Sequence, residues 1–245
     1  MKPRAKTAER REIAIYGAGG FAREVAWLAQ NCRETGKVYE IVCFIDDALD
    51  KIGKTLNGIP VLDWDMARRS FPKAGIVVAI GSPRVREGIV ARVAQAGYGF
   101  ETLIHPRVEK SDGVEMPPGT VVCAGTILTT NIRLGVHVQV NLSCTVGHDV
   151  ILGDFTTLAP GVHVSGWVHF GKRVYVGTGA VIINGTEESP LTIGEDVVIG
   201  AAACVTRSIP AGVTVAGVPA KSLPDSKGKM IRREYGKNLS FSSPS

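Results

Sequence analysis

An apolar residue recurs at every sixth position through the middle of this chain, from Met116 to Ile182. With 44% hydrophobic residues overall, twelve such matches in one register arise by chance about once in 20,000 trials. Small or β-branched residues stand two positions earlier in almost every step, and on a strand two such positions share one face. The two series are Met116, Val122, Leu128, Leu134, Val140, Val146, Leu152, Leu158, Val164, Phe170, Val176 and Ile182, and Thr120, Thr126, Ile132, Val138, Cys144, Val150, Thr156, Val162, Val168, Val174 and Ala180.

This period predicts a parallel β-helix. Six residues cannot be a helical repeat, and the β-branched content favours short strands joined by turns. Three steps would form one triangular coil of 18 residues, and stacked coils would bury the inward ladder between them. Glycines in the same register would supply turns, at Gly135, Gly147, Gly153, Gly171 and Gly177.

The period slips once, between Ile182 and Ile193. Residues 184–190 in this interval are polar and rich in turn formers, so we expect a loop that leaves the coil. That loop is either a tolerated surface insertion or a wall of the substrate site.

A glycine-rich turn lies near the start of the chain. The apolar run 13–16 ends at this turn, and residues 23–30 then have a helical pattern. Gly17, Gly19 and Ala22 match the G-x-G-x-x-G/A pattern, in which backbone amides and a helix N-terminus meet phosphate oxygens. The turn either binds a phosphate or is a tight connection without a ligand.

The elements around this turn predict a small Rossmann-like domain. Further strands are expected at 40–45, 76–80 and 100–104, with a helix at 85–96. They complete one βαβαβ half, whereas a dinucleotide fold requires two, so a mononucleotide or sugar nucleotide is expected as ligand rather than NAD. The residues that could hold it, at the turns and strand ends, are Gly17, Gly19, Gly20, Asp46, Asp47, Gly81 and Ser82.

Composition excludes several classes of protein. The net charge of +5, partly from residues 2–11 and 227–237, is modest and suits substrates that carry phosphates. Aromatic residues make up 6% and do not alternate with basic ones, so no nucleic-acid binding is expected. The five cysteines are scattered and predict reduced thiols rather than a metal site or disulfides. Without a long apolar run or signal segment, we expect a cytoplasmic protein with no membrane insertion.

Catalytic groups are expected at the corners of the coils, because the inward ladder forms the core. Among the corner residues, His148 alone carries an imidazole, which is a neutral base near pH 7. It stands between Gly147 and Asp149, and Gly166 follows one coil later. His148 and the Gly166 backbone N–H would supply the base and the oxyanion donor of an acyl transfer, with Asp149 or a neighbouring polar group orienting the base. The alternative is a solvated surface histidine.

The other histidines are weaker candidates. His163 and His169 fall one residue before an inward aliphatic residue, so they should point outward, to solvent or to a partner chain. His105 lies at the expected domain junction, and His137 is also a weaker candidate. No nucleophile triad is evident in the coils, so direct transfer is favoured over an acyl-enzyme.

Short motifs from residue 13 to residue 223 resemble one family in combination. They are IYGAGGF at 15–21, EV at 24–25, FIDD at 44–47 and AIGS at 79–82, and in the coils Asn141 through GHD at 147–149, GDF at 153–155, LAPG at 158–161 and AGVPAK at 216–221. The chain resembles the bacterial sugar acetyltransferases of the sialic acid O-acetyltransferase-like group. This group includes the N-acetyltransferases of nucleotide-linked 4-amino-4,6-dideoxy sugars.

The resemblance carries further expectations. It implies a left-handed β-helix, a homotrimer with active sites between adjacent β-helices, and acetyl-CoA as co-substrate along the coils, with no metal. The N-terminal domain would hold the sugar nucleotide, His148 would be the general base, and Asn141 would lie near the acceptor sugar. The expected acetyl-CoA contacts are Gly166, Thr157, Gly179, Ala202 and Lys221.

The expected function is acetyl-CoA-dependent N-acetylation of a nucleotide-linked amino sugar. Its alternatives are O-acetylation of sialic acid, another glycan hydroxyl or serine, and a non-catalytic sugar-nucleotide-binding scaffold. The acceptor stays open because Ser82 stands where relatives often have asparagine, and Thr157 where some have histidine. The expected organisation is a basic tail at 1–11, a Rossmann-like sugar-nucleotide-binding domain at 12–106, a β-helix acyltransferase domain at 107–223 and a polar tail at 224–245.

Overall fold

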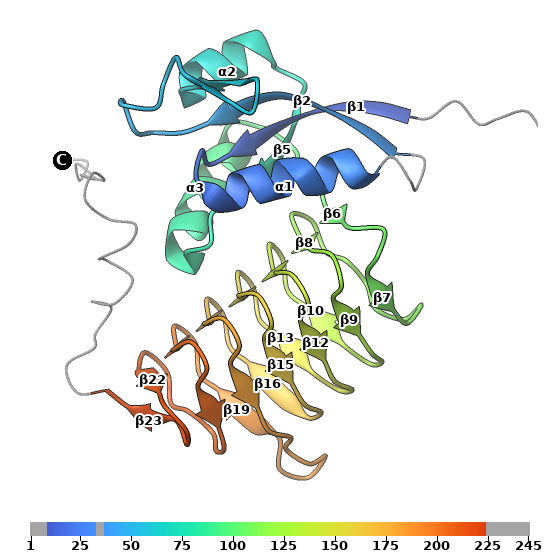
Figure 1. Cartoon of the computed structure of the whole chain (residues 1–245), viewed down its shortest axis with the longest axis vertical. Coiled ribbons are helices and arrows are strands. Elements are labelled where there is room, and N and C mark those ends of the chain that lie inside the picture. The colour runs from blue at the N-terminus through green and yellow to red at the C-terminus, as the bar shows by residue number, and fades with distance from the viewer. Residues whose placement is uncertain (1–8, 33–36, 224–245) are drawn as a thin grey trace, which may run out of the picture.

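The computed structural model describes residues 9–32 and 37–223. The expected tails, at 1–11 and 224–245, lie outside these ranges except for residues 9–11. An α/β layer forms the upper part of the molecule, and a stack of short-stranded coils forms the lower part (Figure 1). This arrangement confirms the predicted fold class.

The upper part is a five-stranded sheet with helices on both faces. Its elements are β1 (Glu9–Tyr16), α1 (Gly20–Asn31), β2 (Lys37–Ile45), β3 (Thr55–Leu56), β4 (Ile59–Leu62), α2 (Trp64–Ser70), β5 (Gly75–Val78) and α3 (Pro83–Gln95). The strand order is β3-β4-β2-β1-β5, and β1 is parallel to β2 and β5. Alternate residues of β1 point to opposite faces, so Ile13 and Ile15 pack with α1, while Ala14 and Tyr16 pack with α2 and α3.

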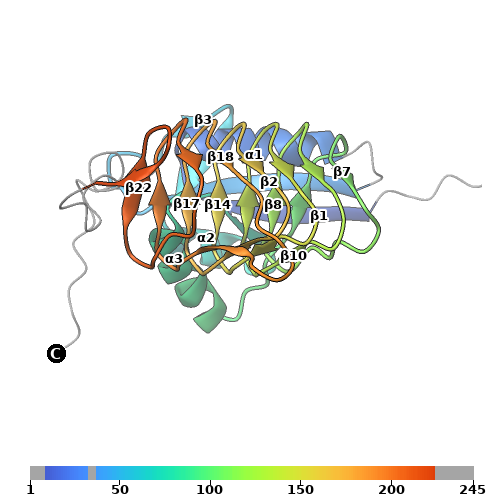
Figure 2. The ribbon, with the colours of Figure 1, turned by 90° about the horizontal axis from the view of Figure 1, so that it is seen from below.

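The lower part is a parallel β-helix with three faces. Face 1 consists of β6 (Leu103–Ile104), β8 (Val121–Val122), β11 (Gln139–Val140), β14 (Thr157–Leu158), β17 (Tyr175–Val176), β20 (Val198–Ile199), β22 (Thr214–Ala216) and β23 (Lys221–Ser222). Face 2 consists of β7 (Glu109–Lys110), β9 (Ile127–Leu128), β12 (Thr145–Val146), β15 (His163–Val164), β18 (Val181–Ile182) and β21 (Cys204–Val205). Face 3 consists of β10 (Arg133–Leu134), β13 (Ile151–Leu152), β16 (Val168–Phe170) and β19 (Leu191–Ile193). Figure 2, a view from below, shows the coils side by side in front of the upper sheet.

The inward ladder forms the core of the β-helix, as the period predicts. Val140, Leu158 and Val176 are at most 1% exposed. Residues one coil apart pair in register, as Gln139 does with Thr157. The predicted slip is also present, because residues 183–190 leave the coil between β18 and β19 before β19 pairs with β16.

Three features of the sheet differ from the prediction. β1 begins at Glu9, so residues 9–11 pair with β2 rather than belonging to a tail. The sequence predicts neither the β3–β4 hairpin nor α2, because elements of two to seven residues are too short for a periodic pattern. The strand expected at 100–104 is not a fourth strand of this sheet: Leu103 and Ile104 pair with β8 of face 1, and Phe100 forms a single bridge to Ile76.

Face 1 packs against the upper part, and the buried side chain of Arg86 lies at this junction. Arg86 is 0% exposed, and its acceptors are the carbonyl oxygens of Ile80, Gly81, His137, Phe155 and Thr156 and the side-chain oxygen of Gln139. None of these acceptors is charged, and burial lowers the pKa of the guanidinium to about 9. The side chain therefore stays protonated at neutral pH and joins α3 to two coils of the β-helix.

Three chemical features of the described residues bear on function. Neither described range, 9–32 or 37–223, contains a helix that is both long and apolar enough to cross a bilayer. The same residues contain no cluster of His, Cys, Asp or Glu arranged for a metal ion. All five cysteines fall in the described part of the chain, and none forms a disulfide bond.

Candidate active site

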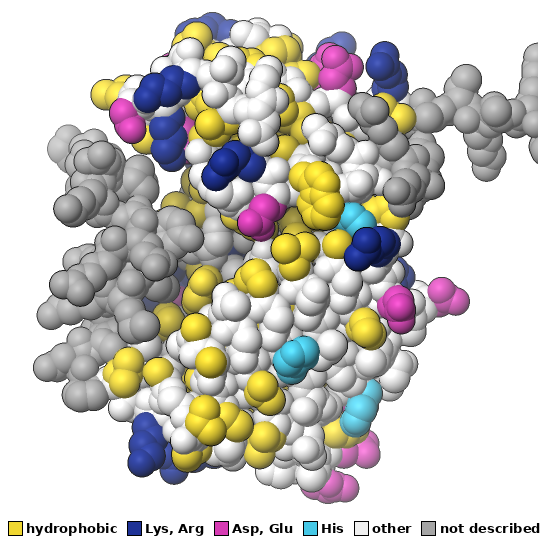
Figure 3. Space-filling view, in the orientation of Figure 1, with side chains coloured by type: hydrophobic (Ala, Val, Ile, Leu, Met, Phe, Trp, Pro, Cys, Tyr) yellow, Lys and Arg dark blue, Asp and Glu magenta, His cyan; other side chains and the backbone are white. Residues whose placement is uncertain are grey.

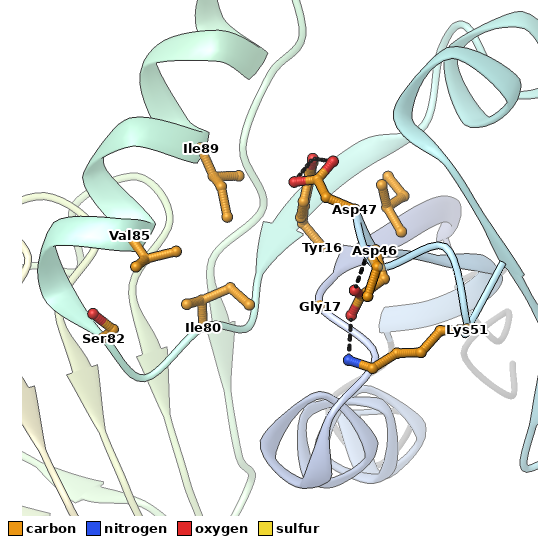
Figure 4. Close-up of a pocket in the computed structure, with 11 residues that line it drawn as sticks. Tyr16, Gly17, Asp46, Asp47, Lys51, Ile80, Ser82, Val85 and Ile89 are labelled. Carbon is orange, nitrogen blue, oxygen red and sulfur yellow. Dashed lines mark hydrogen bonds and ion pairs between the residues drawn. The ribbon is translucent and has the colours of Figure 1, made fainter. Parts of the chain in front are cut away.

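The first part of the site is a pocket of about 180 Å³ at the carboxyl ends of β1, β2 and β5. In parallel α/β sheets this edge is where ligands bind. The lining residues come from the strand ends and the start of α3 (Figure 4), namely Tyr16, Gly17, Ile45, Asp46, Asp47, Ala48, Lys51, Ile80, Ser82, Val85 and Ile89. Four residues expected at the ligand, Gly17, Asp46, Asp47 and Ser82, are thus brought together.

The glycine turn leads from β1 into α1. Gly17 has φ +118°, and a Cβ there would lie 2.9 Å from the carbonyl oxygen of Ala79, so this position requires glycine. Gly19 is the N-cap of α1 in extended backbone, and Gly20 begins the helix. A Cβ at Gly19 or Gly20 would meet no described atom within 4 Å. The open N-terminus of α1 therefore leaves room for a phosphate group.

The carboxylate of Asp46 closes the turn from the other side. It accepts from the backbone N–H of Ala18 at 2.9 Å and of Ala48 at 3.0 Å. Lys51 Nζ lies 2.9 Å from the same carboxylate. Lys51, whose side chain is 40% exposed, thus places an ammonium group in the pocket that Gly17 also lines.

Asp47 is held by two side chains. The Tyr16 hydroxyl donates to Asp47 at 2.9 Å, and Arg92 Nη2 lies 2.8 Å from it. The Arg92 guanidinium also sits over the Tyr16 ring, 5.2 Å from its centroid. Burial, followed by the charges of Asp46 and Asp63, raises the pKa of the Asp47 carboxyl. The sequence gives no local signal for Arg92, which reaches Asp47 only through the packing of α3.

The second part of the site is the turn between β12 and β13, where faces 2 and 3 meet. His148 is exposed there, and its Nδ1 lies 2.8 Å from Oδ2 of Asp149. Hydrogen bonds from His148 and then from Asn131 lower the pKa of the Asp149 carboxyl. A carboxylate at Nδ1 favours the tautomer with its proton on Nδ1, which leaves Nε2 as the basic nitrogen.

Glycine at positions 147 and 166 lets the imidazole lie close against the next coil. A Cβ at Gly166 would come within 2.5 Å of Nε2 and Cε1 of His148. A Cβ at Gly147 would come within 2.8 Å of the Gly166 nitrogen. Trp167 meets the imidazole edge-on, with ring centroids 6.3 Å apart. The His148 ring is therefore close to the Gly166 backbone, as the 18-residue coil predicts.

The structure separates the other expected contacts. Asn141 is 7% exposed, donates to the Leu158 carbonyl oxygen at 3.1 Å, and lies where faces 1 and 2 meet. Gly179 and Ala202 lie along that same edge, and Lys221 is exposed in β23. The expected acetyl-CoA contacts are therefore spread over two edges and face 1 of the β-helix, and of these contacts Gly166 is the one beside His148.

Thr157 corrects one expectation. It is 1% exposed, and its hydroxyl donates to the Gly81 carbonyl oxygen at 2.9 Å. A side chain enclosed between face 1 and the upper sheet offers no surface to acetyl-CoA. Thr157 instead fixes the turn that carries Ser82 at the pocket of the upper sheet.

The remaining histidines occupy different environments. His163 is exposed on face 2, with its Nδ1 2.8 Å from the Thr145 hydroxyl. His137 is 4% exposed and lies against Phe100 and Phe155, and burial lowers its pKa to about 4. His137 is therefore neutral at pH 7 and enclosed, which excludes it as the base.

A parallel β-helix with a His–Asp turn over a glycine, joined to a Rossmann-like sheet, is the architecture of the hexapeptide-repeat acyltransferases. Residues 12–93 match the family described as the PglD N-terminal domain. The chain is 34% identical over 212 residues to GDP-perosamine N-acetyltransferase from Escherichia coli O157:H7, across 85% of this chain and 95% of that protein. It therefore belongs to the family of nucleotide-amino-sugar N-acetyltransferases and is an acetyl-CoA-dependent acyltransferase.

Two solved structures are similar over most of the chain. WeeI from Acinetobacter baumannii AYE is 36% identical with a TM-score of 0.79, covering 88% of this chain and all of that one. A histidine-to-asparagine mutant of perosamine N-acetyltransferase from Caulobacter crescentus, in complex with CoA and GDP-perosamine, is 29% identical with a TM-score of 0.77. That comparison covers 87% of this chain and 97% of the other.

Proposed function

We propose that this chain transfers the acetyl group of acetyl-CoA to the 4-amino group of a nucleotide-linked 4-amino-4,6-dideoxy sugar. The observation that carries the proposal is the presence in one chain of both halves of such a site. The upper sheet supplies a phosphate-binding turn with Lys51, and the β-helix supplies His148 over Gly166. The similarity to a GDP-perosamine N-acetyltransferase extends over both halves.

His148 is the general base of the proposed reaction. As the amine nitrogen attacks the thioester carbonyl carbon, Nε2 of His148 accepts a proton from it, and Asp149 stabilises the resulting imidazolium. The carbonyl oxygen becomes an oxyanion beside the backbone N–H of Gly166. Collapse of the tetrahedral intermediate breaks the carbon–sulfur bond, and the CoA thiolate leaves with the proton that the imidazolium returns.

The nucleotide is proposed to bind in the pocket of the upper sheet. Its diphosphate would lie at the open N-terminus of α1, where Gly19 and Gly20 expose backbone N–H groups and Lys51 adds a positive charge. On binding, the Lys51 ammonium would exchange the Asp46 carboxylate for the diphosphate as its partner. Asp47, oriented by Tyr16 and Arg92, would accept hydrogen bonds from the ribose or the base.

A homotrimer would bring the two halves of the site together. In one chain, the upper part packs on face 1 of the β-helix. His148 lies on the other side, where faces 2 and 3 meet. The pocket of the upper sheet contains no β-helix residue. The view in Figure 3 shows apolar side chains and histidines on a β-helix surface with few charges at its centre. Ile127 and Val181 on face 2 are 38% and 40% exposed, and we propose that a second copy covers them.

Two further assignments depend on this assembly. Gly179 and Ala202 on the face 1–face 2 edge, with Lys221 in β23 of face 1, would contact acetyl-CoA bound against His148 and Gly166 of a neighbouring copy. We also propose a cytoplasmic location, because acetyl-CoA and sugar nucleotides are cytoplasmic metabolites and the cysteines are reduced.

A substrate panel tests the proposed function. Purified protein with acetyl-CoA would be given GDP-, UDP- and dTDP-linked 4-amino-4,6-dideoxy sugars, the matching 4-hydroxy sugars and serine. Release of CoA thiol and the mass of the product would be measured. An N-acetylated amino-sugar nucleotide is the expected product, whereas turnover of hydroxyl acceptors alone would contradict the proposal.

A further inference from the structure

Asn131 stands at the face 2–face 3 edge one coil before Asp149. Its Nδ2 donates to Oδ1 of Asp149 at 3.0 Å, while Oδ2 of the same carboxylate pairs with Nδ1 of His148 at 2.8 Å. The carboxylate is thus held between an amide on one coil and an imidazole on its own turn. The backbone supports this arrangement, because the N–H of Asp149 donates to the carbonyl oxygen of Thr130 at 3.1 Å.

Both members of the pair have the same unusual backbone conformation. Asn131 has φ +56° and Asp149 has φ +58°, in the left-handed region that asparagine and aspartate tolerate better than most residues. Equivalent conformations at equivalent corners stack the two short side chains directly on one another. A longer or branched side chain at position 131 would not present an amide N–H at this distance.

We propose that Asn131 is a positioning residue that acts on the reaction through Asp149. This inference rests on the proposed function, in which His148 is the base. A carboxylate with one partner can rotate about its side-chain bonds, whereas Asp149 with both oxygens engaged keeps a fixed direction. The Asn131 amide thereby fixes the plane of the imidazole and directs its Nε2 toward the substrate.

Few other charges act on this edge. Asn131, Asp149 and Trp167 line a hollow of about 570 Å³ on face 3. Its other charged or titratable lining side chains are Arg133 of β10 and His169 of β16. A carboxylate introduced at position 131 would therefore have its main electrostatic effect on Asp149 and His148.

Two substitutions separate orientation from backbone strain. Asn131→Gly removes the amide but keeps the left-handed backbone, which glycine adopts without cost. We expect kcat to fall about tenfold with both KM values unchanged, because orientation is lost while binding is kept. The ¹⁵N shifts of the His148 ring should show a smaller share of the Nδ1–H tautomer. Asn131→Asp keeps the size of the side chain, but an ionised carboxylate cannot donate to Asp149, so kcat and the share of the Nδ1–H tautomer should fall at least as far.

Asn57 supplies the matched control. It has φ +49° and is exposed in the turn between β3 and β4, outside the nucleotide pocket. Asn57→Gly and Asn57→Asp should leave kcat and the His148 spectra as in wild type. The inference is overturned if Asn131→Gly keeps kcat within roughly twofold of wild type and leaves the ring tautomer unchanged. The spectra need no substrate, so they decide the role of Asn131 even if the substrate panel contradicts the proposed function.

Discussion

His148 is an exposed side chain with very little freedom. Its Nδ1 is paired with Asp149, its ring lies on the backbone of Gly166, and Trp167 meets its edge. Only Nε2 is left for a reacting group. Each restraint comes from a corner residue of the same or the next coil, so the geometry of the base depends on the stacking of the coils.

Removing this imidazole should abolish most of the rate. A general base of this kind contributes about 10²–10⁴ in rate, so His148→Ala should lower kcat by roughly that factor and leave the KM for acetyl-CoA nearly unchanged. His148→Asn should be almost as slow, because it keeps the shape but not the basicity. Steady-state kinetics with the true acceptor would measure both, with His163→Ala as the control. A His148→Ala enzyme with more than about a third of the wild-type rate would refute the base mechanism.

The glycine turn allows a similarly local test of the nucleotide pocket. A valine side chain at Gly19 has space in the protein but would occupy the place of a phosphate, so Gly19→Val should raise the acceptor KM strongly and leave acetyl-CoA binding unchanged. Gly17→Val is the contrasting variant, because its Cβ would collide with Ala79 and the domain should lose stability. Kinetics and thermal melting would be measured on both. If Gly19→Val weakened the binding of the acceptor and of acetyl-CoA equally, the substitution would have damaged the fold rather than the phosphate site.

Among the elements, those with a repeating or local signal could be predicted from the sequence. The inward ladder, the slip before Ile193 and the glycine turn at Gly17 are all read from residues close together in the chain. Arg92 and Lys51 could not be placed, because their positions in the pocket depend on how α3 and the β2–β3 segment pack. The contact between Asn131 and Asp149 could have been predicted from the sequence, because the two residues are one 18-residue coil apart.

The β11 strand begins beside a histidine that should make stability depend on pH. The pKa of His137 is lowered to about 4 in the folded protein, from 6.5, so below pH 6.5 the unfolded chain binds more protons. Stability should therefore fall as the pH falls from about 6.5 to 4, by about 3 kcal/mol from this residue. Urea unfolding of wild type and His137→Asn across this range would measure the effect. If the free energy of unfolding changed with pH equally in the two proteins, this role of His137 would be contradicted.

At the scale of the whole molecule, His148 lies away from the proposed nucleotide pocket of its own chain. We therefore expect activity to require assembly of several chains. Light scattering should give about three times the chain mass of 26.0 kDa. Replacing two apolar residues of face 2, as in Ile127→Lys with Val181→Lys, should dissociate the proposed trimer and abolish turnover together. A monomeric wild-type protein at micromolar concentration that is fully active would contradict the shared site.

The buried guanidinium of Arg86 has a consequence for how this protein can be recombined. Arg86 donates hydrogen bonds to five main-chain carbonyl oxygens and to the side-chain oxygen of Gln139, and these acceptors come from both parts of the molecule. A β-helix moved beneath a foreign N-terminal sheet would leave several of these groups enclosed and unpaired unless the new helix also carried an arginine there. Exchange of N-terminal parts among such enzymes is therefore constrained at one position, and chimeras should keep an arginine at the position of Arg86.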